Sequence, residues 1–589
     1  MFQTQYEDCY FSYKNGKMTI GNDLIERHIC FNSGNPITDY IRNCQTGHSW
    51  CSSQDPVIQS PFPVIEKAGI LARAYISDSE GLSAKHLKAE IFTSGRILQC
   101  RYEYTIYPGL PFLSFKKFIK GSPSNCSNLV SELSKKKQMN VFDCIDAFGI
   151  GGPHFKCKAV KFAEWTDKND FLVKADCTLL YPAGENSLSG NLFVLDDYLL
   201  DEALMIVKEA PSPQCAVNRK SCDLLVRPGR ELQILGTGID PLKLSSDFYT
   251  PSYGYTVGTG KSAKLPSLYK KLCRNVCQNA LKKPHFIMSN TWGDRNEGKN
   301  ICRDFIFKEL NVAHFLGIDI LQIDDGWQKG IDPVRKNKTK PEDGLYAADS
   351  HYWDVDHEKF PGGLNPIVQC AFKYGISLSL WFVPDCSHDL ENWEKDANTL
   401  LGLYKKYKIH CFKLDGVNIS DKQGEINFIR LLEKVFRESN NAISFNMDIT
   451  AQKRFGYLYE QQYGTIFLEN RYTDWGNYYP HNTLKNLWCL SRYLPAERFQ
   501  IEVPNNRRNT EKYNDPLAPS NYTIDYLFAI SIAGNPLLWM EMSKLKKEDQ
   551  EKLSHIISIY KNIRGNLVRI IFALSKTFAG GPFREVFAA

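Results

Sequence analysis

The sequence predicts a multidomain protein in which an N-terminal β-sandwich precedes a (β/α)8 barrel. Short alternating segments separated by turn residues fill the first part of the chain. After about residue 284, apolar strand-like runs alternate with helix-like segments, and aspartates stand at the ends of several of those runs. At 589 residues the chain is long enough for more than one domain, each with its own core.

Residues 1–265 are expected to form the sandwich. Asn15-Gly16 and Ser94-Gly95 lie between segments of alternating hydrophobicity, which is typical of β-hairpins. The segments that predict strands are Tyr10–Ile20, Ala89–Phe92, Ile97–Ile106 and Leu188–Leu195.

Residues 266–565 are expected to form the barrel, because apolar runs of the kind that parallel sheets bury on both faces alternate there with helices. The expected strands are His285–Trp292, Asp319–Trp327, Ser377–Asp385, Cys411–Asp415, Ala442–Asp448, Thr465–Asp474, Phe499–Val503 and Pro536–Met540. The expected helices are Asn300–Leu316, Asn392–Tyr407, Glu425–Ser439, His481–Tyr493 and Lys546–Asn562. Since the last two strands are short, a doubly wound open sheet is the alternative. Residues 566–589 form a short tail, so a C-terminal β-domain is expected to be absent or truncated.

The composition argues against several functions. The net charge of +6 is small for this length and no basic run is long enough to suggest a nucleic-acid-binding stripe, so nucleic acid is not an expected partner. No stretch reaches the roughly 18–20 apolar residues that span a membrane, and no signal peptide is recognised at the start. The 18 cysteines are scattered without CxxC pairs, which favours buried thiols in a reducing compartment. A cytoplasmic protein is expected, and a removed leader would instead allow a secreted or periplasmic one.

Two aspartates at strand ends, Asp415 and Asp474, suggest the chemistry. A retaining glycosidase needs an ionised carboxylate to attack carbon and a protonated carboxyl to release the leaving oxygen, about 5–5.5 Å apart. The mouth of a (β/α)8 barrel brings strand ends together. Either aspartate alone could equally be a turn former or a helix N-cap. The expected strands also place Asp324, Asp325, Asp385, Asp448, Trp292, Trp327 and Trp381 near this end, which favours a site there.

The barrel segment resembles glycoside hydrolase family 36, the α-galactosidase family, and more loosely its clan relative, family 27. The most specific segments are Gln322-Ile323-Asp324-Asp325-Gly326-Trp327 and Phe412-Lys413-Leu414-Asp415. The others are Ser289-Asn290-Thr291-Trp292, Leu380-Trp381-Phe382-Val383-Pro384, Gly534-Asn535-Pro536-Leu537-Leu538 and, in the sandwich, Tyr107-Pro108-Gly109-Leu110-Pro111-Phe112.

The resemblance implies roles for individual residues. Asp415 would be the nucleophile and Asp474 the general acid/base. Asp324 and Asp325 would accept hydrogen bonds from sugar hydroxyls, and Lys413, two residues before Asp415 and so on the same face of the strand, would favour its ionised form. The remaining candidate substrate-binding residues are Trp292, Trp381, Trp327, Arg471 and Asp448.

Several alternatives stay open at this stage. Asp448 competes with Asp474 for the acid role. The segment Asn446–Thr450 lacks the Cys and the Gly-rich loop that are typical of family 36, so the exact sugar is left open. The expected function is a retaining exo-α-glycosidase, in the first place an α-galactosidase. The alternatives are a transglycosidase of the raffinose-synthase type and a catalytically silent glycan-binding protein. Neither a metal nor another cofactor is expected, because cleavage by two carboxyl groups needs none. The expected partners are an oligosaccharide or glycoside substrate and, by family likeness, further copies of the chain in a homo-oligomer.

Overall fold

The structure is a computed structural model of the chain. It describes residues 2–31, 35–51, 69–95, 98–122, 144–152, 154–163, 165–181, 183–211, 222–228, 231–282, 285–294, 298–330, 344–450 and 456–577, with side chains to residue 566. The chain forms two compact units. The first comprises residues 1–163, 173–276 and 455–460, and the second comprises residues 164–172, 277–454 and 461–589. The last part of the expected tail, residues 578–589, lies outside the described residues.

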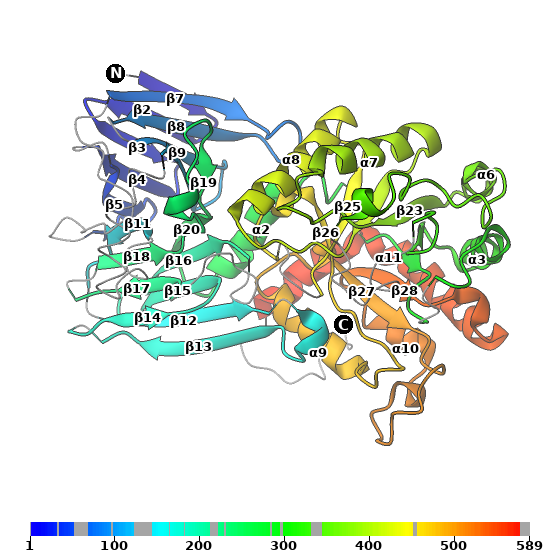
Figure 1. The fold of residues 1–589 in the computed structure, drawn as a ribbon. Coiled ribbons are helices and arrows are strands. Elements are labelled where there is room, and N and C mark those ends of the chain that lie inside the picture. The colour runs from blue at the N-terminus through cyan, green and yellow to red at the C-terminus, as the bar shows by residue number, and fades with distance from the viewer. Residues whose placement is uncertain are drawn as a thin grey trace. The chain divides into compact units, whose positions relative to one another are not determined.

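The first unit contains two mainly antiparallel sheets, as the sequence predicts (Figure 1). One sheet contains β1 (Phe2–Tyr6), β2 (Cys9–Lys14), β3 (Lys17–Gly21), β4 (Ile25–Cys30), β5 (Ile37–Asn43), β6 (Ser49–Trp50), β11 (Cys144–Gly149), β14 (Asn186–Leu188), β17 (Leu224–Val226) and β18 (Glu231–Leu235). The other contains β7 (Gly69–Ser77), β8 (His86–Ser94), β9 (Leu98–Ile106), β10 (Phe112–Gly121), β12 (Phe155–Phe162), β13 (Val173–Leu179), β15 (Leu192–Asp197), β16 (Glu202–Glu209), β19 (Thr250–Pro251) and β20 (Gly254–Gly260).

The predicted hairpins are present in both sheets. Asn15 and Gly16 join β2 to β3 with φ values of 50° and 75°, the left-handed conformation that a tight hairpin turn needs. Ser94 ends β8, and Gly95 follows it before β9 begins at Leu98; Ile97 lies outside the described residues. The turn residues that the sequence indicates therefore stand at the ends of paired strands.

The second unit contains a closed barrel of eight parallel strands. These are β21 (Met288–Asn290), β22 (Ile320–Ile323), β23 (Ser377–Phe382), β24 (Cys411–Leu414), β25 (Ser444–Asp448), β26 (Gly464–Phe467), β27 (Phe499–Pro504) and β28 (Asn535–Trp539). β28 pairs with β21, with Leu537 opposite Met288, and this closure excludes the open-sheet alternative. The side chains that fill the barrel include Met288, Phe467, Leu537 and Trp539, all buried.

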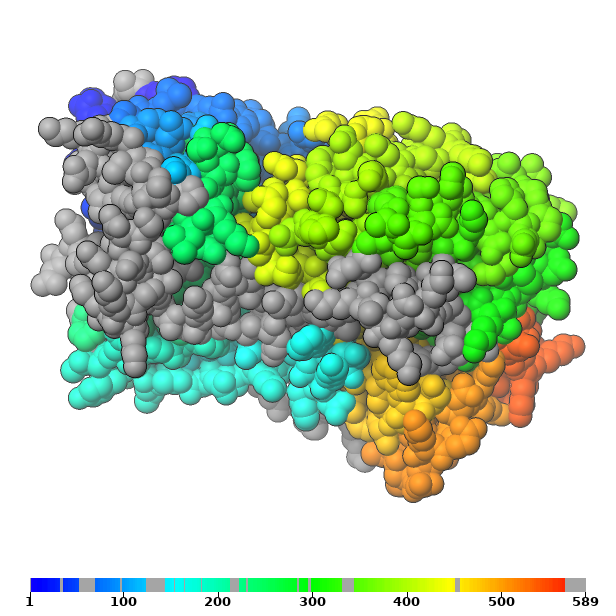
Figure 2. All heavy atoms as spheres, in the orientation of Figure 1, coloured from blue at the N-terminus to red at the C-terminus, as the bar shows by residue number. Residues whose placement is uncertain are grey.

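Helices alternate with the barrel strands along the chain. The α-helices are α2 (Leu265–Val276), α3 (Arg303–Leu316), α5 (Leu345–Ala348), α6 (Asn365–Lys373), α7 (Trp393–Tyr407), α8 (Lys422–Glu438), α9 (Pro480–Ser491), α10 (Ile524–Ala529) and α11 (Lys547–Thr577). Short 3₁₀ turns are η3 (Thr166–Lys168), η4 (Pro241–Lys243), η5 (Gln461–Tyr463), η6 (Ala496–Arg498), η7 (Pro519–Asn521) and η8 (Met542–Lys544). The yellow-green side chains of α7 and α8 form part of the surface in Figure 2.

The sequence of α8 explains where the helix begins and which of its faces is buried. Asp421 caps its N-terminus by accepting hydrogen bonds from the backbone N–H groups of Gln423 and Gly424. Its apolar side chains Phe428, Leu431, Leu432, Val435 and Phe436 are buried. α11 continues to Thr577, well past the predicted end of the last helix at Asn562. Within the described part of the chain, no helix combines the length and the apolar character that crossing a membrane requires.

Candidate active site

The carboxyl ends of neighbouring barrel strands bring the predicted acidic residues together. Asp324 and Asp325 directly follow β22, Asp415 directly follows β24, and Asp448 ends β25. Because all barrel strands run in parallel, these carboxylates reach the same end of the barrel. A site of this kind is what the sequence predicts for that end.

Lys413 stands between three of these carboxylates. Its Nζ lies 3.4 Å from Asp324 Oδ2, 3.4 Å from Asp415 Oδ2 and 3.5 Å from Asp448 Oδ2. Burial alone would lower the pKa of the Lys413 ammonium, but the charges of the three carboxylates outweigh this effect and raise the pKa. Lys413 is therefore charged at neutral pH, and its ammonium also lies over the ring of Phe467, 4.5 Å from the centroid.

Asp324 is fixed by a chain of buried amides. Asn290 Nδ2 donates to Asp324 Oδ2 at 2.7 Å and to Gln322 Oε1 at 2.6 Å, and Gln322 in turn donates to Ser379 Oγ at 2.8 Å. Its neighbour Asp325 accepts a hydrogen bond from Gln328 Nε2 at 2.7 Å. Such supporting contacts hold the two carboxylates in one orientation, and their role in sugar binding stays a prediction.

Asp415 is held on both of its oxygens yet stays partly accessible. Trp381 Nε1 donates to Oδ2 at 3.1 Å, and the backbone N–H of Gly416 donates to Oδ1 at 2.6 Å. Its side chain is 25% exposed, whereas those of Asp324 and Asp448 are each 3% exposed. Among the carboxylates that contact Lys413, Asp415 is therefore the one that an incoming ligand can reach most easily.

Asp448 is placed in a strongly donating environment. Besides Lys413, the backbone N–H and the hydroxyl of Thr450 donate to Asp448 Oδ1, at 2.9 and 2.6 Å. Both carboxylate oxygens of Asp448 are therefore contacted by donors, and the choice between Asp448 and Asp474 for the acid role stays a prediction.

Aromatic side chains support the nucleophile candidate from one side. Trp327 is fully buried, and its Nε1 donates to the backbone carbonyl of Trp381 at 2.9 Å. Trp353 stacks against Trp327 and also contacts the ring of Trp381, with centroids 5.9 Å apart in both pairs. Trp327 and Trp353 therefore position Trp381, and direct contact of Trp327 with a substrate stays a prediction. Trp292 is half-buried and packs against the cluster that contains Trp539.

Asp474 and Arg471 lie in the loop after β26. Asp474 is half-buried, and its charge acts on Tyr513, whose pKa is raised to about 12 mainly by burial. Arg471 is directed elsewhere, because its guanidinium donates to the backbone carbonyls of Asp167 and Asn169. Arg471 thus anchors the segment 165–172 to the barrel, and a direct role in substrate binding stays a prediction. The pairing of Asp474 with Asp415 also stays a prediction.

Sequence patterns did not identify two polar residues of the barrel interior, Asn446 and Glu502, as candidate site residues. Asn446 is beside Lys413 in the β24–β25 register and has no exposed surface, and in the described structure neither its Oδ1 nor its Nδ2 has a hydrogen-bond partner. Glu502 on β27 accepts a hydrogen bond from the backbone N–H of Glu469, while its Oε2 is also without a partner there. Burial, followed by the nearby charge of Glu469, raises the pKa of Glu502 well above its ordinary value. The only sequence signal is that both are polar residues flanked on each side by an apolar residue of their strand.

Comparison with known proteins finds this fold in solved structures of α-galactosidases. No protein-family model matches the chain. The solved structures that resemble it include the family 36 α-galactosidase AgaB from Geobacillus stearothermophilus, with a TM-score of 0.65 and 11% identity over 95% of this chain and 87% of that one. A variant of AgaA from the same organism in complex with raffinose gives a TM-score of 0.64 and 11% identity, over 94% of this chain and 87% of that one.

Sequence similarity to curated proteins is local. α-Galactosidase 1 of Pediococcus pentosaceus is 27% identical over 168 residues, and α-galactosidase 2 of the same organism is 37% identical over 76 residues. These matches cover 27% and 13% of this chain, and only 20% and 9% of the relatives' own lengths. The chain therefore has the fold of family 36 α-galactosidases and distant sequence similarity to α-galactosidases.

Proposed function

We propose that the protein is a retaining exo-α-glycosidase that hydrolyses terminal α-galactosyl residues. The observation that supports this function best is the contact of one buried ammonium, Lys413, with three carboxylates at strand ends, of which only Asp415 is substantially exposed. Buried polar atoms that have no partner among the described residues, such as those of Asn446, suit a ligand that is rich in hydroxyl groups. One of the similar solved structures is described as a complex with raffinose and another as a complex with stachyose.

The proposed chemistry uses Asp415 and Asp474. The Asp415 carboxylate attacks the anomeric carbon while Asp474 gives its proton to the leaving oxygen, so that the glycosidic bond breaks and a glycosyl ester forms. Asp474 then takes a proton from water, which attacks the anomeric carbon and releases Asp415. Trp381 and Gly416 keep the attacking carboxylate oriented through both steps.

The experiment compares the wild type with Asp415→Gly and Asp474→Gly on a panel of p-nitrophenyl α- and β-glycosides. Only the α-galactoside should be cleaved. Asp415→Gly should lose nearly all of this activity, and Asp474→Gly should show a strongly reduced kcat, because hydrolysis of the glycosyl-enzyme then lacks its general base. An exposed aspartate on α3, replaced in Asp304→Ala, is the matched control and should keep full activity.

Azide identifies which carboxyl group does what. With Asp415→Gly, azide replaces the nucleophile and attacks once, so the product is the β-glycosyl azide. With Asp474→Gly, azide attacks the glycosyl-enzyme instead of water, and the product is the α-glycosyl azide. The opposite assignment of anomers would reverse the two roles, and no cleavage by the wild type would exclude hydrolysis. Transfer to an added acceptor sugar, or binding without any product, would then favour the transglycosidase or the silent glycan-binding protein.

A further inference from the structure

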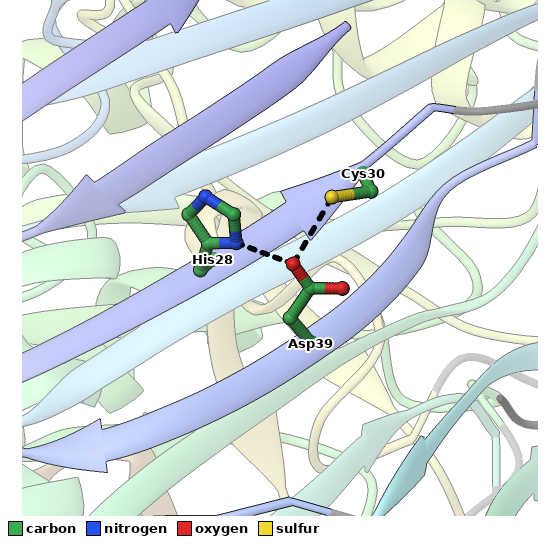
Figure 3. Close-up of side chains that lie close together, drawn as sticks. All are labelled: His28, Cys30 and Asp39. Carbon is green, nitrogen blue, oxygen red and sulfur yellow. Dashed lines mark hydrogen bonds and ion pairs between the residues drawn. The ribbon is translucent and has the colours of Figure 1, made fainter. Parts of the chain in front are cut away.

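Three metal-ligating side chains meet on the first sheet of the first unit. His28 and Cys30 are two residues apart on β4 and so point to the same face, and Asp39 belongs to the neighbouring strand β5. Asp39 Oδ2 lies 2.6 Å from His28 Nδ1 and 3.0 Å from Cys30 Sγ (Figure 3). The three ligand atoms lie within 4.8 Å of one another, and no other such group of three occurs among the described residues.

An irregularity in the sheet aims Asp39 at the other two residues. The β4–β5 register pairs His28 with Tyr40 but Ile29 with Thr38, so Asp39 is the extra residue of a β-bulge. Thr38 and Ile41 are buried on the inner face, whereas Asp39 and Tyr40, which lie between them, are both more exposed. A regular strand would alternate these side chains, and the bulge instead turns Asp39 toward the face of His28 and Cys30.

The backbone below this cluster is held rigidly. Arg27, the residue before His28 on β4, is fully buried and donates through Nε to Thr38 Oγ1 at 3.1 Å. Its guanidinium also pairs with Asp146 Oδ2 at 2.5 Å and donates to the Tyr255 hydroxyl at 2.7 Å. On the outer face, the ring of Tyr40 stacks on the His28 imidazole at 5.5 Å. These contacts fix both strands and the imidazole plane before any ligand arrives.

We propose that His28, Cys30 and Asp39 form a binding site for a divalent transition-metal ion, with Zn²⁺ as the preferred occupant. Imidazole nitrogen, thiolate sulfur and carboxylate oxygen are the three donor types that Zn²⁺ takes in proteins. Tetrahedral bonds of 2.0–2.3 Å would separate the ligand atoms by roughly 3.3–3.8 Å. Asp39 therefore has to withdraw by only a fraction of an ångström to about 1 Å, which its 37% exposed side chain allows. On binding, the Cys30 thiol releases its proton to solvent, and water completes the coordination.

The spacing rules for helical zinc motifs do not detect the arrangement of His28, Cys30 and Asp39. The first two ligands are two residues apart on a strand, and the third comes from an adjacent strand through a bulge. The site would tie β4 to β5, and metal binding would stabilise the folded form by mass action.

Metal titration of the full chain tests the proposal. Chelator-treated protein is titrated with Zn²⁺ in competition with a chromophoric chelator, and the wild type should bind one equivalent more tightly than any other. Cys30→Ser and Asp39→Asn should each lower this affinity at least about 100-fold, since loss of even a supporting residue costs 10–100-fold. Cys177→Ser, which alters an exposed cysteine on β13, is the matched control and should leave the affinity unchanged.

Cobalt gives an independent readout. Co²⁺ bound to the wild type should show thiolate-to-metal charge-transfer absorption, which Cys30→Ser should lose while keeping its thermal midpoint in the absence of metal. If Cys30→Ser does not fold, Asp39→Asn and His28→Gln decide, because both side chains are partly exposed. An affinity that is equal in all variants, or a cobalt spectrum without the thiolate band in the wild type, would overturn the proposal.

Discussion

Replacing Lys413 with methionine tests whether its charge controls the proposed nucleophile. Methionine keeps much of the length and apolar volume of the lysine stem, and it removes the ammonium that lies 3.4 Å from Asp415 Oδ2. Two unit charges at this separation attract by about 5 kcal/mol at an effective dielectric constant of about 20. Because Asp415 is 25% exposed, solvent weakens this attraction, and we expect a loss of about 3 kcal/mol in transition-state stabilisation, at the low end for a broken buried ion pair.

The expected loss corresponds to a reduction of roughly 100- to 200-fold in kcat/KM for p-nitrophenyl α-galactoside. The direction of the pH effect follows from the sign of the removed charge. An ammonium favours the ionised carboxylate, so without it the acidic limb of the kcat/KM profile should move to higher pH. Lys413→Arg keeps the charge and is the matched control, expected to lose activity through misplacement without this shift.

The pH profile distinguishes an electrostatic role from a structural one. If Lys413→Met lowered activity while its acidic limb stayed where the wild type has it, the ammonium would act by packing alone. If kcat/KM were unchanged, the three short Lys413–carboxylate contacts would be irrelevant to the reaction, and the reasoning would fail. Circular dichroism and the thermal midpoint establish that the variant is folded before either conclusion is drawn.

Three further predictions follow from the same geometry. Asp474→Asn should slow the hydrolysis of raffinose far more than that of p-nitrophenyl α-galactoside, because p-nitrophenolate leaves without a proton. Asp448→Asn should slow the hydrolysis of both substrates equally. Steady-state kcat/KM values of the two variants on the two substrates test which aspartate is the acid. Glu502→Gln should keep its thermal midpoint as pH rises above about 4.5 better than the wild type. The wild-type fold retains a proton on Glu502 that the unfolded chain releases, so its stability falls with pH, and parallel midpoint-versus-pH curves would contradict this. Gly293→Ala should lower the free energy of unfolding by at least about 3 kcal/mol, because a Cβ there would lie 1.9 Å from the Trp539 carbonyl oxygen. The thermal midpoint should therefore fall strongly, and an unchanged midpoint would be inconsistent with this packing.

Much of the fold follows from local sequence features. The eight barrel strands and their order are confirmed, because apolar runs between helical segments identify parallel strands without knowledge of distant contacts. Strand ends were harder to predict, since β22 ends at Ile323 whereas the expected strand extended to Trp327. Beyond Ile323 the chain turns to place Asp324 and Asp325 at the barrel mouth, and hydrophobicity does not report where ladder hydrogen bonds stop.

The candidate site was predictable only in part for a similar reason. Lys413 and Asp415 share a strand face, so period-two spacing predicts their proximity. The contacts of Lys413 with Asp324 and Asp448 depend on the register between β22, β23, β24 and β25. Asn446 and Glu502 are polar residues between apolar neighbours in their strands, and a sequence alone does not show whether such residues face the barrel interior or the helices.

The charge balance of the barrel mouth links these contacts to the reaction proposed for it. Lys413 supplies one positive charge against the carboxylates of Asp324, Asp415 and Asp448, so these four side chains carry a net charge of −2 when all are ionised. Such a site is costly in the free protein, and Lys413 limits that cost. The excess negative charge becomes favourable when positive charge develops on the sugar ring in an oxocarbenium-like transition state. One lysine among three carboxylates therefore leaves the attacking group ionised without neutralising the field that the transition state requires.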